Sequence, residues 1–453
     1  MHKLHTLLLL LAALASAEPR GLVSQDYFRL QSIGEATISP DGTRIAYTIT
    51  SHERPGRPFS RLWIMTVAGR NSTPLSKDSE ASSGAVWSPD GRWIAYEKTE
   101  TVRTGLFVAR ADGTGSRRIA DLEWTNSPIQ DPGQKLAWSP DSRQIAYVSA
   151  VAGPETEEAG GDPVVIRRYT YKPDYAEGLT RLNDNRRLHL FVVDAAGGEA
   201  TSLTEGVWSE HSIDWSPDSN EVLFVSNRES DPDRFLNHDL FAVSVSGGTV
   251  RRIMATESSE YRPRWSPDGK SIAYLGTRRG LTDLETTMED THVWLSGADG
   301  SGRRELGASI DNRQGAPAWS RDGKYLYCAV QERGNTHLYR LPLDGGKPEA
   351  MVADRGSLGA WSLAADGTIA YAFRGPSDTE QLYLKRPGRP LEKLTDLNTP
   401  VLAAKQLAEV ESLTFTSNDF KYDVEAFLTK PLGLIEGSHH PLITIIHGGP
   451  HAQ

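Results

Sequence analysis

One short motif recurs along the chain and restricts its fold more than any other feature. An aromatic or aliphatic residue is followed by Ser, and in most copies then by Pro, Asp and either Gly or Ser. The seven copies begin at Ile38, Trp87, Trp138, Trp215, Trp265, Trp319 and Trp361. The last copy keeps only its first two residues. A unit that returns roughly every 50 residues indicates a repeat architecture.

The motif has the composition of a tight turn between two antiparallel strands. Pro pre-sets φ for the second turn position, Asp is accepted at the third, and Gly supplies the left-handed residue that follows. The residues after the turn are β-branched or aromatic, as in residues 93–96, which favours a strand. We therefore expect each copy to form a β-hairpin whose Trp, Ser, Pro, Asp and Gly residues build the fold and not a site.

Each repeat contains further strand signals after this hairpin. In the third repeat, residues 190–193 are apolar, residues 196–198 form a Gly-rich turn, and residues 200–204 favour a last short strand. Four antiparallel strands of this kind make a propeller blade. We predict a mainly β chain with a seven-bladed β-propeller over residues 35–398. We expect no strand to be shared between first and last blades, so that side-chain packing alone holds this seam and lets it open.

The third repeat carries an insertion at residues 151–187. Its first part is acidic and includes Glu157 and Glu158, and its second part, residues 164–171, is apolar and basic. Long insertions in compact repeats are functional or disordered. We interpret the acidic part as a solvated loop, with a clamp for a substrate amino group as the alternative. The second part is interpreted as an extended hairpin that reaches toward another domain or the channel mouth.

The N-terminus has the features of a signal peptide over residues 1–17. A short apolar core at residues 7–14 follows Lys3, and residues 15–17 are small enough for a signal peptidase. The core is far shorter than the roughly 20 residues of a membrane span. We expect an exported protein, periplasmic or secreted, that is not membrane-bound in its mature form. Residues 18–34 form a lead-in segment, with helical turns expected at 25–30.

Charge and cysteine content narrow the possible partners. The formal net charge is −10 and the chain has no basic run, which argues against a nucleic acid or an anionic membrane as partner. Cys328 is the single cysteine, so there is no disulfide framework. It lies in a strand pattern, and we interpret it as a buried structural thiol. No His spacing matches a zinc motif, and we expect neither metal nor cofactor.

The pattern changes after residue 398. Residues 411–416 and 423–428 favour two strands joined near Asn418 and Asp419, and residues 442–446 form an apolar run typical of a buried parallel strand. The sequence His447-Gly448-Gly449-Pro450 follows directly. In α/β-hydrolases the loop after such a strand supplies one N–H of the oxyanion hole, where Gly lets the backbone approach closely. We therefore assign residues 399–453 to the beginning of an α/β-hydrolase domain.

Seven such repeats followed by His-Gly-Gly-Pro resemble the prolyl oligopeptidase family of serine peptidases, in its acylaminoacyl-peptidase and dipeptidyl-aminopeptidase-like branch. The resemblance covers the mature chain. It implies a propeller that caps the active site and admits only peptides, which a hydrolase domain cleaves through Ser, Asp and His. It also implies that the N–H of Gly449, favoured over that of Gly448, holds the oxyanion, while His447 and Pro450 shape the loop.

The sequence departs from this family at the nucleophile. No Gly-x-Ser-x-Gly elbow is present, so the nucleophile, general base and acid are missing and we expect an N-terminal portion of a peptidase that is inactive alone. The catalytic His follows the nucleophile in this fold, so no His at the C-terminal end is assigned to that role. Two alternatives remain: a TolB-like propeller that binds a protein or peptide, and a polysaccharide lyase on a propeller.

Overall fold

The computed structural model describes residues 21–446 except 55, 128, 130, 160, 162, 164, 173–181, 278–290 and 436. The expected signal peptide lies outside these residues. Strands dominate the described chain, and helices are confined to single turns: α2 (Ser24–Tyr27), α3 (Thr156–Ala159) and α4 (Thr399–Leu402). The structure is therefore mainly β, as predicted.

The strands fall into consecutive antiparallel groups of four, of which the first five are separate sheets. The first group is β1 (Gln31–Ile38), β2 (Arg44–Ser51), β3 (Phe59–Thr66) and β4 (Ser72–Pro74). The second is β5 (Ala81–Trp87), β6 (Trp93–Glu100), β7 (Arg103–Arg110) and β8 (Arg117–Leu122). The third is β9 (Leu136–Trp138), β10 (Gln144–Val151), β11 (Arg187–Asp194) and β12 (Thr201–Ser202).

The later groups follow the same order. The fourth is β13 (Glu210–Trp215), β14 (Glu221–Ser226), β15 (Asp239–Ser244) and β16 (Arg251–Met254), and the fifth is β17 (Glu260–Trp265), β18 (Ser271–Thr277), β19 (Thr291–Gly297) and β20 (Arg304–Glu305). The sixth is β21 (Ala318–Trp319), β22 (Tyr325–Glu332), β23 (Asn335–Pro342) and β24 (Glu349–Val352). The last is β25 (Ser357–Leu363), β26 (Ile369–Arg374), β27 (Gln381–Lys385) and β28 (Glu392–Lys393). One parallel pair, Thr336 with Ser357, joins the last two groups into an eight-stranded sheet.

The Ser-Pro-Asp turns form as the sequence predicts. In six copies the Ser hydroxyl donates to the Asp carboxylate two residues later, at 2.6–2.7 Å. The next residue has a left-handed backbone, for example Gly91 at φ 70° and Ser142 at φ 62°. The Ser and Asp side chains therefore bond to one another within the turn, which supports the interpretation that they build the fold and not a site.

The Trp of the motif also links successive groups. Its indole N–H donates at 3.0–3.1 Å to a carbonyl on the first strand of the preceding group: Trp87 to Thr37, Trp138 to Val86, Trp215 to Ala137 and Trp319 to Arg264. A bond repeated in this way sets the first strands side by side. The first copy of the motif has Ile38 in place of Trp, and so offers no indole at that position.

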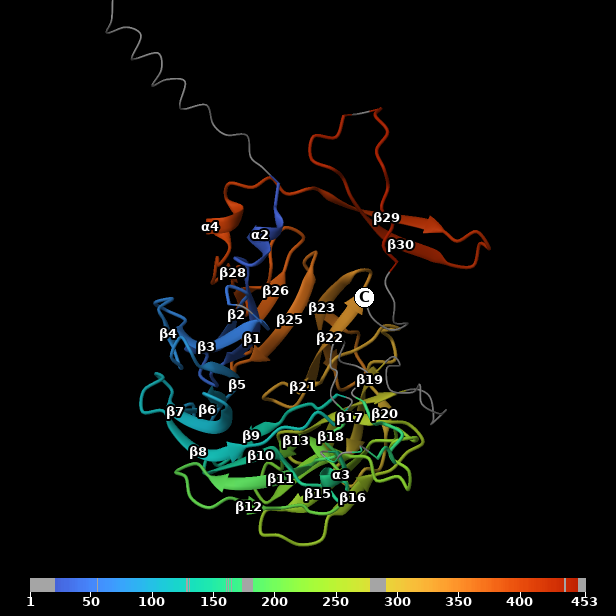
Figure 1. The fold of residues 1–453 in the computed structure, drawn as a ribbon. Coiled ribbons are helices and arrows are strands. Elements are labelled where there is room, and N and C mark those ends of the chain that lie inside the picture. The colour runs from blue at the N-terminus through green and yellow to red at the C-terminus, as the bar shows by residue number, and fades with distance from the viewer. Residues whose placement is uncertain are drawn as a thin grey trace, which may run out of the picture.

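The last group packs against the first, and this contact corrects one prediction. Side chains of β1–β3 and of β26–β27 share one apolar cluster, which includes Ile45 and Leu384. Hydrogen bonds reinforce it: Ile33 N donates to Glu380 O at 3.0 Å, and Ile38 N donates to Ser362 Oγ at 2.8 Å. Packing alone therefore does not hold the seam. Figure 1 shows β1 lying beside β25 and β26.

The lead-in segment is fastened near the same seam. Its helix α2 overlaps the helical turns expected at 25–30. The carboxylate of Asp26, a residue that is 5% exposed, pairs with Lys405 Nζ at 2.6 Å. The segments that enter and leave the four-stranded groups are therefore bound to one another.

Beyond α4 the chain forms a two-stranded hairpin, β29 (Val410–Thr416) and β30 (Asp423–Thr429). This confirms the two strands expected there, and Figure 1 shows them projecting from the rest of the fold. The prediction of a buried strand at residues 442–446 is wrong for this structure. Ile443 is 85% and Ile446 89% exposed, and no described strand pairs with this segment.

Candidate functional site

The predicted oxyanion loop lies beyond the described part of the chain. His447, Gly448, Gly449 and Pro450 all fall outside the described residues. Their role stays a prediction. The site that the structure describes in detail is instead a pocket in the insertion of the third group.

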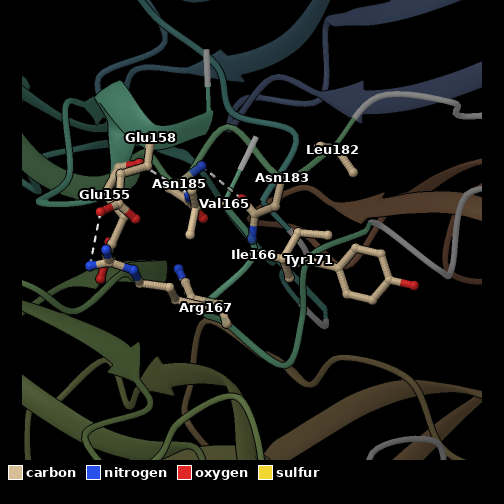
Figure 2. A pocket seen from close by; sticks show the side chains of 10 residues that line it. Glu155, Glu158, Val165, Ile166, Arg167, Tyr171, Leu182, Asn183 and Asn185 are labelled. Atoms are coloured by element: carbon tan, nitrogen blue, oxygen red, sulfur yellow. Dashed lines mark hydrogen bonds and ion pairs between the residues drawn. The ribbon is translucent and has the colours of Figure 1, made fainter. Parts of the chain in front are cut away.

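This pocket is formed by the described parts of the insertion (Figure 2). Figure 2 shows Glu155 and Glu158 on one side and Tyr171 and Leu182 on the other. The lining residues are Glu155, Glu158, Val165, Ile166, Arg167, Arg168, Tyr171, Leu182, Asn183 and Asn185. Six of these ten side chains are charged or amide groups and four are apolar or aromatic, so the pocket offers both polar and apolar contacts. The hairpin expected for the second part is not seen, since its described residues form no strand.

Hydrogen bonds hold the pocket walls in place. Asn183 ties the two limbs of the insertion together, because its Nδ2 donates to Thr170 O at 2.8 Å and its backbone N donates to Tyr171 O at 2.8 Å. The guanidinium of Arg168 donates through Nε at 3.0 Å and through Nη2 to Asp233, which precedes β15 in the fourth group. The insertion is thus anchored to its own group and to the next.

The return limb is also anchored toward the start of β9. Asn126 Nδ2 donates to Leu182 O at 2.7 Å, and Asn126 Oδ1 accepts from Asp184 N at 2.6 Å. Asn126 belongs to the connection between β8 and β9. The pocket is therefore built on the fold and is not a free loop.

Both acids of the pocket already have basic partners. Glu155 pairs with Arg187 at 2.7 Å, and Glu158 pairs with Arg167 at 3.1 Å. The side chain of Arg187 is 8% exposed and that of Arg167 is 69% exposed. Of the suggested amino-group clamp, Glu158 lines the pocket and Glu157 does not. A cation that reaches Glu158 would have to displace only the exposed Arg167.

A second polar cluster lies at irregular positions of the first strands. In five groups the register shifts near the start of that strand, and the residue entering the bulge is Gly34, Gly84, Ser212, Arg262 or Gly359. Gly84, Ser212 and Arg262 have φ values of 68°, 54° and 53°. Gly adopts this left-handed backbone freely, whereas Arg does so at a cost. Ser212 and Arg262 are thus both non-glycine residues in this conformation, and Arg262 is the one with a charged side chain.

Arg262 uses this position to reach a residue 131 places earlier. Its Nε donates to Asp131 Oδ1 at 2.6 Å, and its Nη2 contacts the same oxygen. Asp131 also has a left-handed backbone, with φ 45°. The Arg262 side chain is 33% exposed and that of Asp131 31%. The sequence analysis did not identify either residue; the available signal was an Arg three places before Trp265, where the second repeat has Gly84 and the fourth has Ser212.

Buried imidazoles lie next to this ion pair. Burial, then the neighbouring His238 and Arg262, hold the pKa of His211 well below its usual range. Burial lowers the pKa of His238 to about 4. The rings of His211 and His238 are in edge contact, with centroids 5.4 Å apart. Both imidazoles are therefore neutral near pH 7 and add no positive charge beside Arg262.

Other candidates are inert or absent within the described residues. Cys328 is fully buried, and burial raises the pKa of its thiol to about 12, which confirms its structural role. In the described part of the chain no three His, Cys, Asp or Glu side chains are grouped so as to hold a metal ion. None of the helices in that part is both long and apolar enough to cross a membrane.

The sequence of this chain is similar to a propeller family model and to two peptidases. A family model described as the TolB beta propeller domain matches residues 165–299. The uncharacterized peptidase YuxL of Bacillus subtilis (strain 168) is 30% identical over 457 residues, which cover 95% of this chain and 66% of that relative. Dipeptidyl-peptidase 5 of Arthroderma otae is 27% identical over 172 residues, or 37% of this chain and 23% of the relative. The chain thus spans only part of the length of each relative.

Solved structures show the same fold. An acylaminoacyl peptidase in complex with Z-Gly-Gly-Phe-chloromethyl ketone aligns with a TM-score of 0.70 at 18% identity, covering 92% of this chain and 60% of that chain. The acylaminoacyl peptidase of Pyrococcus horikoshii aligns with a TM-score of 0.69 at 16% identity, again covering 92% of this chain and 60% of that chain.

Proposed function

This chain belongs to the prolyl oligopeptidase family of peptidases, and on that premise we propose that it acts in the hydrolysis of peptides by a serine-type mechanism. The groups of four strands form a seven-bladed propeller that controls access to a catalytic α/β-hydrolase domain. That domain cleaves the peptide through an acyl-enzyme. The observation that carries this proposal is the 30% identity to a peptidase over 95% of the chain.

We assign to the pocket in the insertion the binding of a part of the peptide substrate that lies away from the scissile bond. The pocket's four apolar or aromatic residues suit the side chains of a short peptide. Glu158 is the group assigned to a substrate amino terminus, because its partner Arg167 is exposed and its ion pair is weak. Binding energy from such remote contacts can be used to position the scissile bond.

The chemical step is assigned to residues beyond those described. The oxyanion donor is the N–H of Gly449, within the loop of His447, Gly448, Gly449 and Pro450. The sequence contains no Gly-x-Ser-x-Gly elbow, so these 453 residues by themselves are expected to be inactive. Residues 1–17 direct export, and the mature protein is periplasmic or secreted.

Two measurements test this function. The reading frame after the codon for Gln453 should continue into a Gly-x-Ser-x-Gly elbow. The protein encoded by the whole frame should hydrolyse dipeptidyl, aminoacyl or acylaminoacyl chromogenic substrates and lose this activity to a serine-directed phosphonate. The isolated 453-residue chain should hydrolyse none of them. Hydrolysis by that chain that the phosphonate blocks would contradict its assignment as inactive.

The alternative is a propeller that binds a protein or peptide without catalysis. The match of residues 165–299 to a TolB propeller model favours it. A frame that stops without an elbow, together with a purified protein that binds peptides but hydrolyses none, would support this alternative.

A further inference from the structure

We propose that Arg262 is a receptor for a carboxylate of the bound peptide, and that Asp131 occupies this receptor when no ligand is present. The proposal rests on the proposed function in one respect only, namely that the chain binds peptides. It assigns a substrate contact to the first strand of the fifth group, away from the pocket in the insertion.

The backbone of Arg262 provides the first argument. The second and fourth groups have Gly84 and Ser212 at the equivalent bulge position, with the same left-handed backbone, so the fold does not require Arg there. A left-handed conformation costs a non-glycine residue about 1 kcal/mol. A strained residue that the fold does not need is an indication of function.

The geometry of the ion pair provides the second argument. Asp131 offers a single oxygen, Oδ1, to both Nε and Nη2 of Arg262. A carboxylate that is free to orient can present one oxygen to each donor in the fork arrangement, which is the stronger one. Both side chains are about one-third exposed, so a ligand can reach the guanidinium. Asp131 therefore holds the Arg262 guanidinium in position, and a ligand carboxylate can replace it.

The location provides the third argument. The bulge lies near the start of the first strand, and the second strand of each group ends at that same edge because the two run antiparallel. The insertion leaves β10 at this edge. Asp131 and Asn126 belong to the same connection before β9, and Asn126 bonds directly to the pocket limb through Leu182. A peptide in the pocket would thus lie on the side of the fold that carries Arg262.

The proposal is tested by isothermal titration calorimetry of the 453-residue chain with three forms of one tetrapeptide, Ala-Ala-Phe-Ala. The first has a free C-terminal carboxylate, the second a C-terminal amide, and the third is the amide with Glu in place of Phe. A charge-assisted fork is stronger than a neutral hydrogen bond, so we expect the first or third form to bind about 10-fold more tightly than the second. Tighter binding of the first form would identify the recognised group as a C-terminal carboxylate, and tighter binding of the third form would identify it as a side-chain carboxylate.

Two variants separate this role from a structural one by the sign of their effects. Arg262→Gly relieves the backbone strain and should abolish the preference for a carboxylate. Asp131→Asn tolerates the left-handed backbone and removes the competing charge, so the carboxylate form should bind several-fold more tightly and the amide form unchanged. A merely structural ion pair would instead weaken all forms in both variants. Arg143→Ala, an exposed Arg beside a Ser-Pro-Asp turn, is the matched control.

The remaining outcomes are equally decisive. Equal binding of the carboxylate and amide forms overturns the assignment of Arg262 while leaving peptide binding intact. Binding of none of the three forms overturns both this inference and the peptide-binding part of the proposed function. Weaker binding of the carboxylate form to the Asp131→Asn variant would overturn the proposal that a ligand carboxylate replaces Asp131 at Arg262.

Discussion

The side-chain amide of Asn398 pairs with both backbone groups of Gln31. Asn398 Oδ1 accepts from Gln31 N at 2.8 Å, and Asn398 Nδ2 donates to Gln31 O at 2.9 Å. The two residues are 367 positions apart, and Asn398 is fully buried. The Asn398 side chain thus makes the two backbone hydrogen bonds to Gln31 that a neighbouring strand would otherwise make. It closes the seam between the first and last groups, whose described strands lie in two separate sheets.

Asn398→Ala should destabilise the fold by about 2–4 kcal/mol, because it leaves the backbone groups of Gln31 without this partner at a buried site. Hydrogen exchange should become faster in β1 and β26 than in β10. Urea unfolding and native-state exchange measure the two effects. Asn71→Ala, at an exposed position, is the control. An unchanged unfolding midpoint would show that packing alone is sufficient at the seam.

Glu260→Gln should stabilise the protein increasingly as the pH rises. Burial, the main cause, and the nearby Asp239 raise the pKa of Glu260 from 4.5 to about 8. The folded state therefore binds more protons than the unfolded state between these values, and stability falls as pH increases from 4.5 to 8. The variant lacks this titration, and we expect a gain of about 1–3 kcal/mol at pH 8. The gain should be near zero at pH 4.

The measurement is urea unfolding at both pH values, with the exposed Glu205→Gln as control. The amide in the variant can still accept the hydrogen bond that Thr256 Oγ1 donates to Glu260 at 2.6 Å. A gain of equal size at both pH values would mean that packing, and not titration, accounts for the difference.

Gly84→Ala should destabilise the second group by about 1–2 kcal/mol. The backbone of Gly84 is left-handed, and an added Cβ would lie 3.2 Å from the Glu97 carboxylate. Gly375→Ala, where an added Cβ meets nothing within 4 Å, is the control. Thermal unfolding of both variants measures the difference. Equal midpoints would show that the bulge relaxes without strain.

Cys328 should react with iodoacetamide only after unfolding. The thiolate is the reactive form, and burial both hides the thiol and raises its pKa to about 12. Labelling followed by mass spectrometry, with and without 6 M guanidinium (roughly the concentration that unfolds most domains), measures this. Rapid labelling of the native protein at pH 8 would reveal an opening of the sixth group that the structure does not contain.

Sequence reasoning predicted the features that depend on neighbouring residues. The Ser-Pro-Asp turns, the four strands of each repeat and the hairpin β29–β30 follow from local turn chemistry and side-chain alternation. The run at residues 442–446 shows the limit of this reasoning. Its apolar composition favours a strand, but a strand forms only where another offers hydrogen bonds, and sequence pattern does not state whether one is near.

The sequence by itself determined the repeating β architecture, the structural role of the repeated turns and the family resemblance. Tertiary structure alone decided how the seam is fastened through Gln31 and Asn398, how the pocket is anchored by Asn126 and Arg168, and that Arg262 meets Asp131. The reason is physical. A turn is specified by atoms within a few residues, whereas these pairs join residues 56 to 367 positions apart, whose proximity arises only when all the sheets have packed.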